Sequence, residues 1–221
     1  MKINKEYYYV LLSLFLFLLI STLDTFFAEN TIDYELNDKT LVDVIHNNFK
    51  SNVSQSIPNN IVLFIFCYSI LRFIFIDPNV VSYMFILLSI IFLLRLFAFT
   101  VTQTPPPYSK YDKKRYETCH RTVLGHLGLS ISKSYASCID SMFSGHAATS
   151  IIGAMMIILF SKYVVEVVIF ILLIIINLFL ISVSRLHYTS DVYISSIITG
   201  LLLFAFPFKS FVKVINKINL F

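Results

Sequence analysis

Apolar runs long enough to cross a lipid bilayer constrain this chain more than any other feature of its sequence. A membrane-spanning helix needs roughly 20 mainly apolar residues. Six runs come close to that length: about Tyr7–Leu23, Asn60–Ile76, Val80–Thr100, Ser144–Tyr163, Val164–Val183 and Asp191–Phe208. The composition agrees, because 57% of the residues are hydrophobic and 14% are charged, whereas soluble domains have about 45–50% and about 25%. We therefore expect an all-α membrane protein, a six-transmembrane-helix bundle that forms one domain over residues 1–221.

The first run has the look of a signal peptide, because Lys2 and Lys5 precede its apolar core. The residues that follow, with Phe26 before Ala28, are a poor context for cleavage. We therefore expect a retained helix. Six spans, an even number, would put both termini on the same side of the membrane.

The distribution of charge predicts which side that is. Cations gather on one face of the predicted bundle: Lys2, Lys5, Arg72, Lys162, Lys209, Lys213 and Lys217. The positive-inside rule makes this face cytosolic. On the opposite face an acidic loop follows the first run, but the loop Val101–Phe143 carries six cations that break the rule. We interpret these cations as functional rather than as a sign of the opposite topology, which places His146 and His187 on the luminal or exterior side.

Nucleic acid is not expected as a partner, because the net charge of +4 is modest and no basic run is interleaved with aromatic residues. Cys119 and Cys138 share one polar loop and have neither a CxxC nor a zinc spacing. A single disulfide is the most they allow, and two free thiols are the alternative. His120 and His126 lie in the same loop. Their spacing fits no common metal site, so we interpret them as polar loop residues.

The stretch Ser184–Asp191 places a histidine, a carboxylate and a cation at the edge of an apolar segment. On a helix His187 and Asp191, four residues apart, would share a face. The carboxylate could then accept the proton of one imidazole nitrogen and leave the other free to act as base or nucleophile. A solvated helix end with an incidental ion pair is the alternative interpretation.

A second cluster, Ser144-Gly145-His146, stands at the start of the fourth run. Ser-Gly at a helix start exposes backbone N–H groups and the positive end of the helix dipole, which favours phosphate binding. For the tripeptide alone, a capped helix with an interfacial histidine is the alternative. The fourth and fifth runs are joined by a short connection at Lys162, so we expect them to bring His146 and His187 together. One histidine could then attack phosphorus while the other protonates the leaving oxygen.

Three blocks of the chain resemble the sphingomyelin synthases and related ceramide phosphotransferases of the lipid-phosphatase (PAP2-like) superfamily. The first is similar to the family's glycine-leucine-serine-isoleucine and C-x-D-x-x-F-S-G-H run: Gly128-Leu129-Ser130-Ile131, then Cys138, Asp140 and Phe143-Ser144-Gly145-His146. The second, within Ser184–Asp191, is similar to the H-Y-T-x-D block. The third is Arg95 ahead of Val101–Pro107, similar to the arginine that precedes the V-T-x-x-P block. The first 90 residues match only in hydropathy.

The resemblance implies that His187 is the nucleophile, Asp191 its orienting partner and His146 the acid and base. It also implies a PAP2-like core over about residues 60–208 and chemistry without a metal or other cofactor. The residues agree, because no carboxylate cluster suited to Mg²⁺ stands near these histidines. Arginine, lysine and backbone N–H groups would then have to neutralise the reacting phosphate.

The phosphate-binding residues that we expect are Arg95, Ser144, Gly145 and Arg185. An arginine late in an apolar span is costly, by about 2.5–3.5 kcal/mol near the bilayer centre. Arg95 is therefore the strongest of the four, with snorkelling to the headgroups as its alternative. Arg185 is two residues from His187 and off its helical face, but an unwound helix start would let it reach the same phosphate.

The implied reaction transfers phosphocholine, phosphoethanolamine or phosphoinositol from a glycerophospholipid donor to a ceramide acceptor in the bilayer. It passes through a phosphohistidine and releases diacylglycerol. The expected location is the Golgi or plasma membrane, with cytosolic termini and a luminal or exoplasmic site, and a homo-oligomer is left open.

Two other functions compete with this one: a lipid phosphate phosphatase that uses water as acceptor, and a catalytically silent lipid-binding membrane protein. Lipid phosphatases carry K-x₆-R-P and an arginine six residues before the nucleophile. Here position 181 is isoleucine and no Arg-Pro pair occurs, which favours the transferase. Ile139 departs from the ceramide phosphotransferases, which have glycine there. Intact His146, His187 and Asp191 argue against a silent protein.

Overall fold

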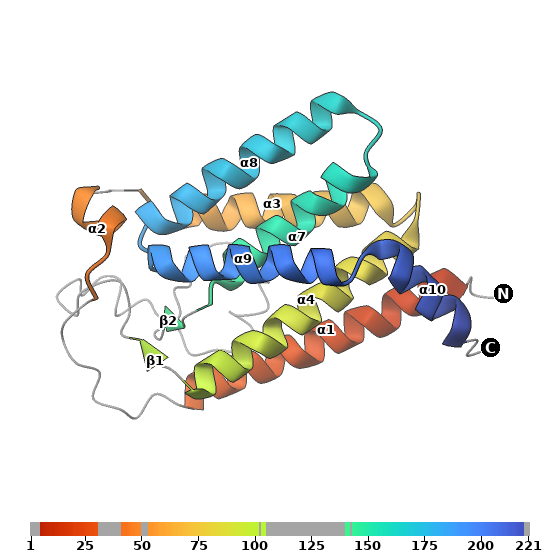
Figure 1. The fold of residues 1–221 in the computed structure, drawn as a ribbon, viewed down its shortest axis with the longest axis horizontal. Helices are drawn as coiled ribbons and strands as arrows, with labels where there is room; N and C mark the ends of the chain where they lie inside the picture. The colour runs from red at the N-terminus through yellow and green to blue at the C-terminus, as the bar shows by residue number, and fades with distance from the viewer. Residues whose placement is uncertain are drawn as a thin grey trace.

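The computed structural model describes residues 5–30, 41–49, 53–101, 103–104, 140–141 and 143–218. Its long helices form a bundle: α1 (Lys5–Asn30), α3 (Ser56–Phe73), α4 (Pro78–Val101), α7 (Gly145–Phe160), α8 (Val164–Val183) and α9 (Thr189–Ala205). The short helices α2 (Val44–Asn48) and α10 (Phe208–Ile218) lie at opposite ends of this bundle (Figure 1). Strands β1 (Gln103–Thr104) and β2 (Asp140–Ser141) pair antiparallel. Apart from this two-residue pairing, the expected all-α architecture is confirmed over the described residues.

Helix α7 is central to the bundle and packs against α3, α4, α8 and α9. Small residues let membrane helices approach one another closely, and Gly153 does so here. A Cβ added at Gly153 would lie 3.0 Å from Ile65 Cγ2 of α3. The hydroxyl of Ser69 donates to the Gly153 carbonyl at 2.7 Å. A side chain at position 153 would therefore require the Ile65 side chain or α3 to shift.

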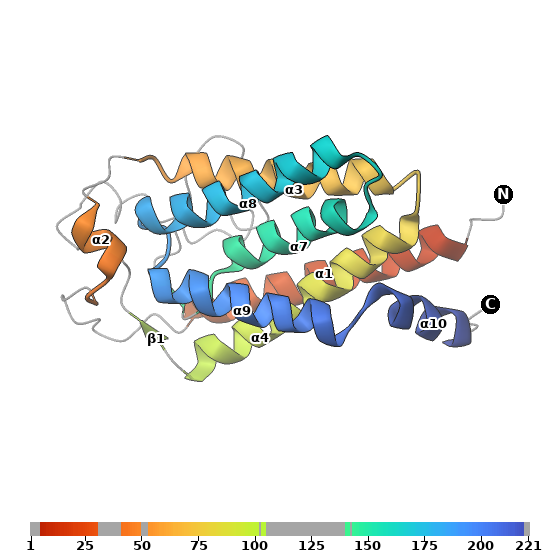
Figure 2. The same ribbon diagram turned by 45° about the horizontal axis from the view of Figure 1, so that its top comes forward.

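Helix α1 lies alongside α4, as both views of the bundle show (Figures 1 and 2). Phe17 of α1 stacks on Phe85 of α4, with ring centroids 5.8 Å apart. The same ring meets Phe92 edge to face at 5.6 Å. Elsewhere α1 exposes large apolar side chains such as Phe15. In a bilayer that exposed surface contacts lipid, while the phenylalanine contacts hold α1 against α4.

The six-span count is not confirmed. Among the described residues, the helices long and apolar enough to cross a membrane contribute the spans Lys5–Asp24, Ser56–Phe73, Pro78–Ala98 and Val164–Val183. These support a multi-pass integral membrane protein. Helices α7 and α9 are apolar but shorter, at 16 and 17 residues. At about 1.5 Å per residue they reach about 24–26 Å, against a hydrocarbon core of about 30 Å.

The two shortened helices have local causes at their C-terminal ends. Helix α7 stops at Phe160 because Ser161 is extended, so the predicted run Ser144–Tyr163 loses its last turn. Helix α9 stops at Ala205 because Pro207 cannot donate a backbone hydrogen bond to continue it. The chain then starts the separate amphipathic helix α10, which packs Phe208 against Tyr83 with ring centroids 5.5 Å apart. The sequence analysis did not predict α10.

The start of α1, the end of α10 and the α3–α4 and α7–α8 turns lie at one end of the bundle, whereas α2 and the α8–α9 connection lie at the other (Figure 1). The predicted cation-rich face therefore corresponds to one end of the molecule. Several sequence predictions fall outside the described residues: the loop cations, a disulfide between Cys119 and Cys138, and the roles of His120 and His126.

Candidate active site

His146 and His187 lie side by side, as predicted, although 41 residues separate them in the sequence. His146 Nδ1 is 3.4 Å from His187 Nε2. The ring centroids are 5.6 Å apart and the ring planes are inclined by 57°. His187 is buried, with 4% of its surface exposed, whereas His146 is partly exposed. The two imidazoles therefore present a nitrogen each to the same point in space.

A buried network of side chains fixes the first turn of α7, which carries His146. Ser144 is the N-cap, and its hydroxyl oxygen accepts the Ala147 N–H at 3.2 Å. The Ser195 hydroxyl of α9 donates to the Ser144 carbonyl at 2.7 Å. The Ser150 hydroxyl donates to the His146 carbonyl at 2.8 Å. The backbone on either side of His146 is thus held by side chains, which limits the movement of its imidazole.

Helix α8 supplies the other end of that network through Asn177. Its amide nitrogen donates to Ser150 Oγ at 2.8 Å, and Asn177 is fully buried. Asn177 was not predicted as a site residue from the sequence. A polar amide deep in the apolar run Val164–Val183 was the available signal, because such residues in a span are costly and mark a specific contact.

His187 lies in the connection between α8 and α9, residues 184–188, which we call the His187 loop. The end of α8 is a Schellman motif: Leu186 N–H donates to the Ile181 carbonyl at 3.1 Å and Arg185 N–H to the Ser182 carbonyl at 3.0 Å. Arg185 has φ of 56°. This left-handed position usually holds glycine, and an arginine there carries a cost of about 1–2 kcal/mol. The loop therefore retains Arg185 against its backbone preference.

The predicted helical relation between His187 and Asp191 is wrong. Helix α9 begins at Thr189 with Tyr188 as its N-cap, so His187 precedes the helix and does not share a face with Asp191. Asp191 sits in the first turn, and one of its oxygens accepts the Tyr188 N–H at 3.2 Å. A carboxylate three residues after the N-cap favours this contact, because it satisfies a donor that the helix leaves open. Asp191 therefore shapes the turn next to His187, and its orienting role stays a prediction.

Arg95 of α4 lies against the N-terminus of α7. A Cβ added at Gly145 would collide with Arg95 Nη1, so only glycine lets the guanidinium come this close. Arg95 Nε is 3.6 Å from Asp24 Oδ2 of α1, and both side chains are largely buried. Burial beside Asp24 favours a role for Arg95 inside the bundle over the alternative of snorkelling to the headgroups. The geometry puts a cation beside the backbone N–H groups at the helix start, next to His146.

Asp24 was missed as a neighbour of the site because the sequence analysis assigned it to an acidic loop. Helix α1 continues to Asn30 and carries Asp24 within it. Arg185 behaves differently from Arg95: its Nη2 donates to the His46 carbonyl of α2 at 3.2 Å. That contact anchors the His187 loop, and phosphate binding by Arg185 stays a prediction.

Two residues of α2 also contact the His187 loop and its flanks. Asp43 is the N-cap of α2, and His46 lies within the helix. Burial raises the pKa of Asp43, but hydrogen bonds from the backbone of Thr189 and His46 outweigh it and hold the pKa below its ordinary value of 3.8. Burial lowers the pKa of His46 below its ordinary value of 6.5, although the nearby Asp43 opposes the shift. Both residues thus favour a carboxylate beside a neutral imidazole.

The described residues contain no group of three or more histidine, cysteine, aspartate or glutamate side chains that could hold a metal ion. Metal-independent chemistry stays a prediction, since His120, His126 and Cys119 lie outside the described residues.

Residues 137–208 match the family model described as PAP2 superfamily C-terminal. The matched segment is about one third of the chain and contains His146, His187 and Asp191. No curated protein matches the chain. The match supports a relation to the PAP2-like lipid-phosphatase superfamily and lipid chemistry of the phosphatase or phosphotransferase type. It does not distinguish the ceramide phosphotransferases from other members.

Proposed function

We propose that this protein transfers a phospho-headgroup from a glycerophospholipid to the primary hydroxyl of ceramide. His187 Nε2 attacks phosphorus, and the bond from phosphorus to the diacylglycerol oxygen breaks. His146 gives its proton to that oxygen, and diacylglycerol leaves. The ceramide oxygen then attacks the phosphohistidine while His146 takes the hydroxyl proton. The phosphorus–nitrogen bond breaks and His187 is restored.

The observation that carries this proposal is the 3.4 Å approach of His146 Nδ1 to His187 Nε2. A nucleophile and an acid must border the same reacting atom, and each must lie within hydrogen-bond reach of its target. The entering phosphate displaces the direct contact between the two rings. Arg95 is close enough to Gly145 to bind the phosphate oxygens together with the first N–H groups of α7. Asp191 keeps the start of α9, and so His187, in place.

Two features of the chain support transfer over hydrolysis. Ile181 occupies the position where lipid phosphatases have an arginine, and it is fully buried. Burial of His187 also restricts the access of water to the phosphohistidine. A lipid phosphate phosphatase is the second candidate, because the family match at residues 137–208 covers that chemistry equally well.

The test uses purified protein in vesicles that contain labelled ceramide. Each vesicle preparation holds one donor lipid: phosphatidylcholine, phosphatidylethanolamine or phosphatidylinositol. We expect diacylglycerol and modified ceramide in equal amounts with one donor. His146→Ala should slow both half-reactions, by about 10²–10⁴ if proton transfer is its only role. It should still form phosphohistidine from a donor with a more acidic leaving group. Tyr193→Ala, at an exposed position on α9, is the matched control. Release of free phospho-headgroup into water as fast as ceramide is modified would favour the phosphatase instead.

A further inference from the structure

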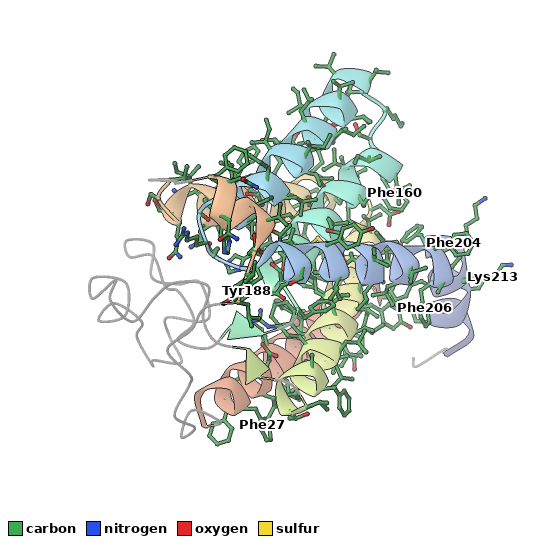
Figure 3. The ribbon with its side chains drawn as sticks, turned by 60° about the vertical axis from the view of Figure 1, so that its left-hand side comes forward. Phe27, Phe160, Tyr188, Phe204, Phe206 and Lys213 are labelled. Carbon is green, nitrogen blue, oxygen red and sulfur yellow. The ribbon has the colours of Figure 1, made fainter. Side chains whose placement is uncertain are left out.

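We propose that α2 clamps the His187 loop in its reactive position, with Asp43 and His46 as positioning residues. The proposal rests on the proposed function in so far as His187 is the nucleophile. Both residues lie outside the segment 137–208 that matches the family model. They come from the part of the chain between α1 and α3, about 140 residues away from the loop that they contact. Figure 3 shows α2 beside Tyr188, the residue that follows His187.

Asp43 caps two helices with one carboxylate. Its Oδ1 accepts the N–H groups of Ile45 at 2.9 Å and His46 at 3.1 Å, which starts α2. Its Oδ2 accepts the Thr189 N–H at 2.7 Å, and Oδ1 also accepts the Thr189 hydroxyl at 2.8 Å. The N-cap of α9 is Tyr188, a residue type that does not usually cap, so Asp43 supplies an acceptor from elsewhere in the chain.

His46 holds the other flank of the loop. Its Nε2 lies 3.0 Å from the Ser182 carbonyl in the last turn of α8. A carbonyl only accepts, so Nε2 carries the proton. The imidazole also packs on the Tyr188 ring, with centroids 5.6 Å apart. In return Arg185 Nη2 donates to the His46 carbonyl at 3.2 Å. His46 therefore joins the end of α8 to the residue after His187.

Two further contacts close the clamp around the loop. Gln55, just before α3, donates to the Arg185 carbonyl at 3.2 Å. The Leu41 N–H donates to the Tyr188 hydroxyl at 3.2 Å. Arg185 and Tyr188, which stand on either side of His187, are thus both bound to residues that precede α3. Asp43 and His46 are themselves buried, which strengthens their hydrogen bonds.

The loop needs this support because it is irregular. His187 lies outside any helix, and Arg185 two residues earlier has an unfavourable backbone conformation. A nucleophile must be held within about 0.5 Å of its productive position. Loosening the loop should therefore reduce the fraction of bound substrate that reacts, while the lipid still binds through Arg95 and Gly145. The clamp should act on kcat rather than on KM.

The first test compares Asp43→Ala, His46→Leu and His46→Gln. We expect Asp43→Ala and His46→Leu to lower kcat by about 10–100-fold with KM within about twofold. His46→Gln keeps an N–H that can reach the Ser182 carbonyl, so it should recover most of the lost rate. The matched control is Asp77→Asn, which weakens a cap at the start of α4, at the opposite end of the bundle. It should leave both kinetic constants unchanged.

A second measurement separates the clamp from the proposed function. Hydrogen–deuterium exchange at the Thr189 amide reports the bond to Asp43 whether or not the protein acts on ceramide. We expect at least about tenfold faster exchange at Thr189 in Asp43→Ala and no change there in Asp77→Asn. Unchanged exchange, or unchanged kcat in folded Asp43→Ala and His46→Leu, would overturn the clamp. A wild-type protein that shows protected Thr189 but no transfer to ceramide would overturn the proposed function alone.

Discussion

The two ends of the bundle both hold partly buried charged side chains, but among the described residues only one of them also brings two imidazoles together. At the α7–α8 turn, Glu166 is the centre of a closed cluster. It accepts hydrogen bonds from the hydroxyls of Tyr68, at 2.5 Å, and Ser161. Arg72 Nε lies 3.3 Å from the same carboxylate, and its guanidinium lies over the Tyr163 ring. Tyr68 and Arg72 tie α3 to α8, and Ser161 and Tyr163 tie the α7–α8 turn to the same cluster.

At the opposite end the polar groups include two imidazoles and a guanidinium. His146 and His187 face each other, and Arg95 stands by the start of α7 in a looser pair with Asp24. The difference teaches that burial of charge in this fold is not in itself a sign of a site. What distinguishes the histidine end is the convergence of two imidazole nitrogens with a cation and a helix N-terminus.

The largest expected effect separates the two ends most clearly. His187→Ala should abolish both diacylglycerol release and ceramide modification, by at least about 10³, because it removes the proposed acceptor of the headgroup. The measurement is product formation in vesicles together with trapping of phosphohistidine. Transfer to ceramide that survives in His187→Ala would require a different nucleophile.

Removing the cation at each end gives the next largest contrast. Arg95→Ala should lower kcat/KM by about 10²-fold, because phosphate charge would lose its main side-chain partner. Arg95→Lys should recover only part of this, since an ammonium lacks the planar fork of donors. Arg72→Ala, the same change at the Glu166 end, should leave kcat/KM within about twofold. Equal losses for Arg95→Ala and Arg72→Ala would show that the two arginines are alike in function.

Acid should weaken the α2 clamp before it affects the Glu166 end. The pKa of His46 is lowered below 6.5 by burial, and the nearby Arg185 also disfavours its charged form, while Asp43 opposes both. When α2 is detached from the His187 loop, His46 therefore binds more protons than it does in the clamp once the pH falls below 6.5. The clamped state loses stability as the pH falls further. Asp43 adds a further loss below 3.8, because hydrogen bonds hold its pKa under that value.

The check on this pH dependence is the melting temperature of wild type and His46→Gln. Between about pH 7 and about pH 5 the wild type should lose more stability than the glutamine variant, whose side chain does not titrate. The same pH dependence in both proteins would show that His46 does not contribute.

The smallest effect on activity belongs to Glu166→Gln. The amide keeps one acceptor oxygen but loses the charge-assisted bond to Arg72, so the free energy of unfolding should fall by about 1–2 kcal/mol. Ceramide modification at a temperature where the protein is folded should stay within about twofold of wild type. Thermal unfolding in detergent measures the loss of stability, and the vesicle assay measures the rate of ceramide modification. A large loss of activity in a folded variant would show that the Glu166 cluster affects the histidine site.

The features that depend on local composition could be predicted from the sequence. The run Val164–Val183 corresponds residue for residue to α8, and the short turn after α7 brought His146 to His187. Prediction from the sequence failed where a structure depends on distant partners. Helix α2 has five residues, too few for an apolar periodicity that would predict a helix. The contacts that hold it are with a loop about 140 residues away, which the local sequence does not indicate. His187 and Asp191 were wrongly placed on one helical face because the residue at which α9 begins cannot be read from an unbroken apolar run.

The shortness of α7 has a consequence for where the reaction takes place. Helix α8 has 20 residues and reaches about 30 Å, whereas α7 has 16 and reaches about 24 Å. If both helices ran along the membrane normal from their shared turn at one surface, the first residue of α7 would stop about 6 Å short of the other surface. His146 would then work beneath the headgroups, at the depth where lipid backbone oxygens lie. Under the proposed function, a ceramide hydroxyl would then meet the phosphohistidine by moving sideways within its own leaflet, whereas water would have to enter from the headgroup side.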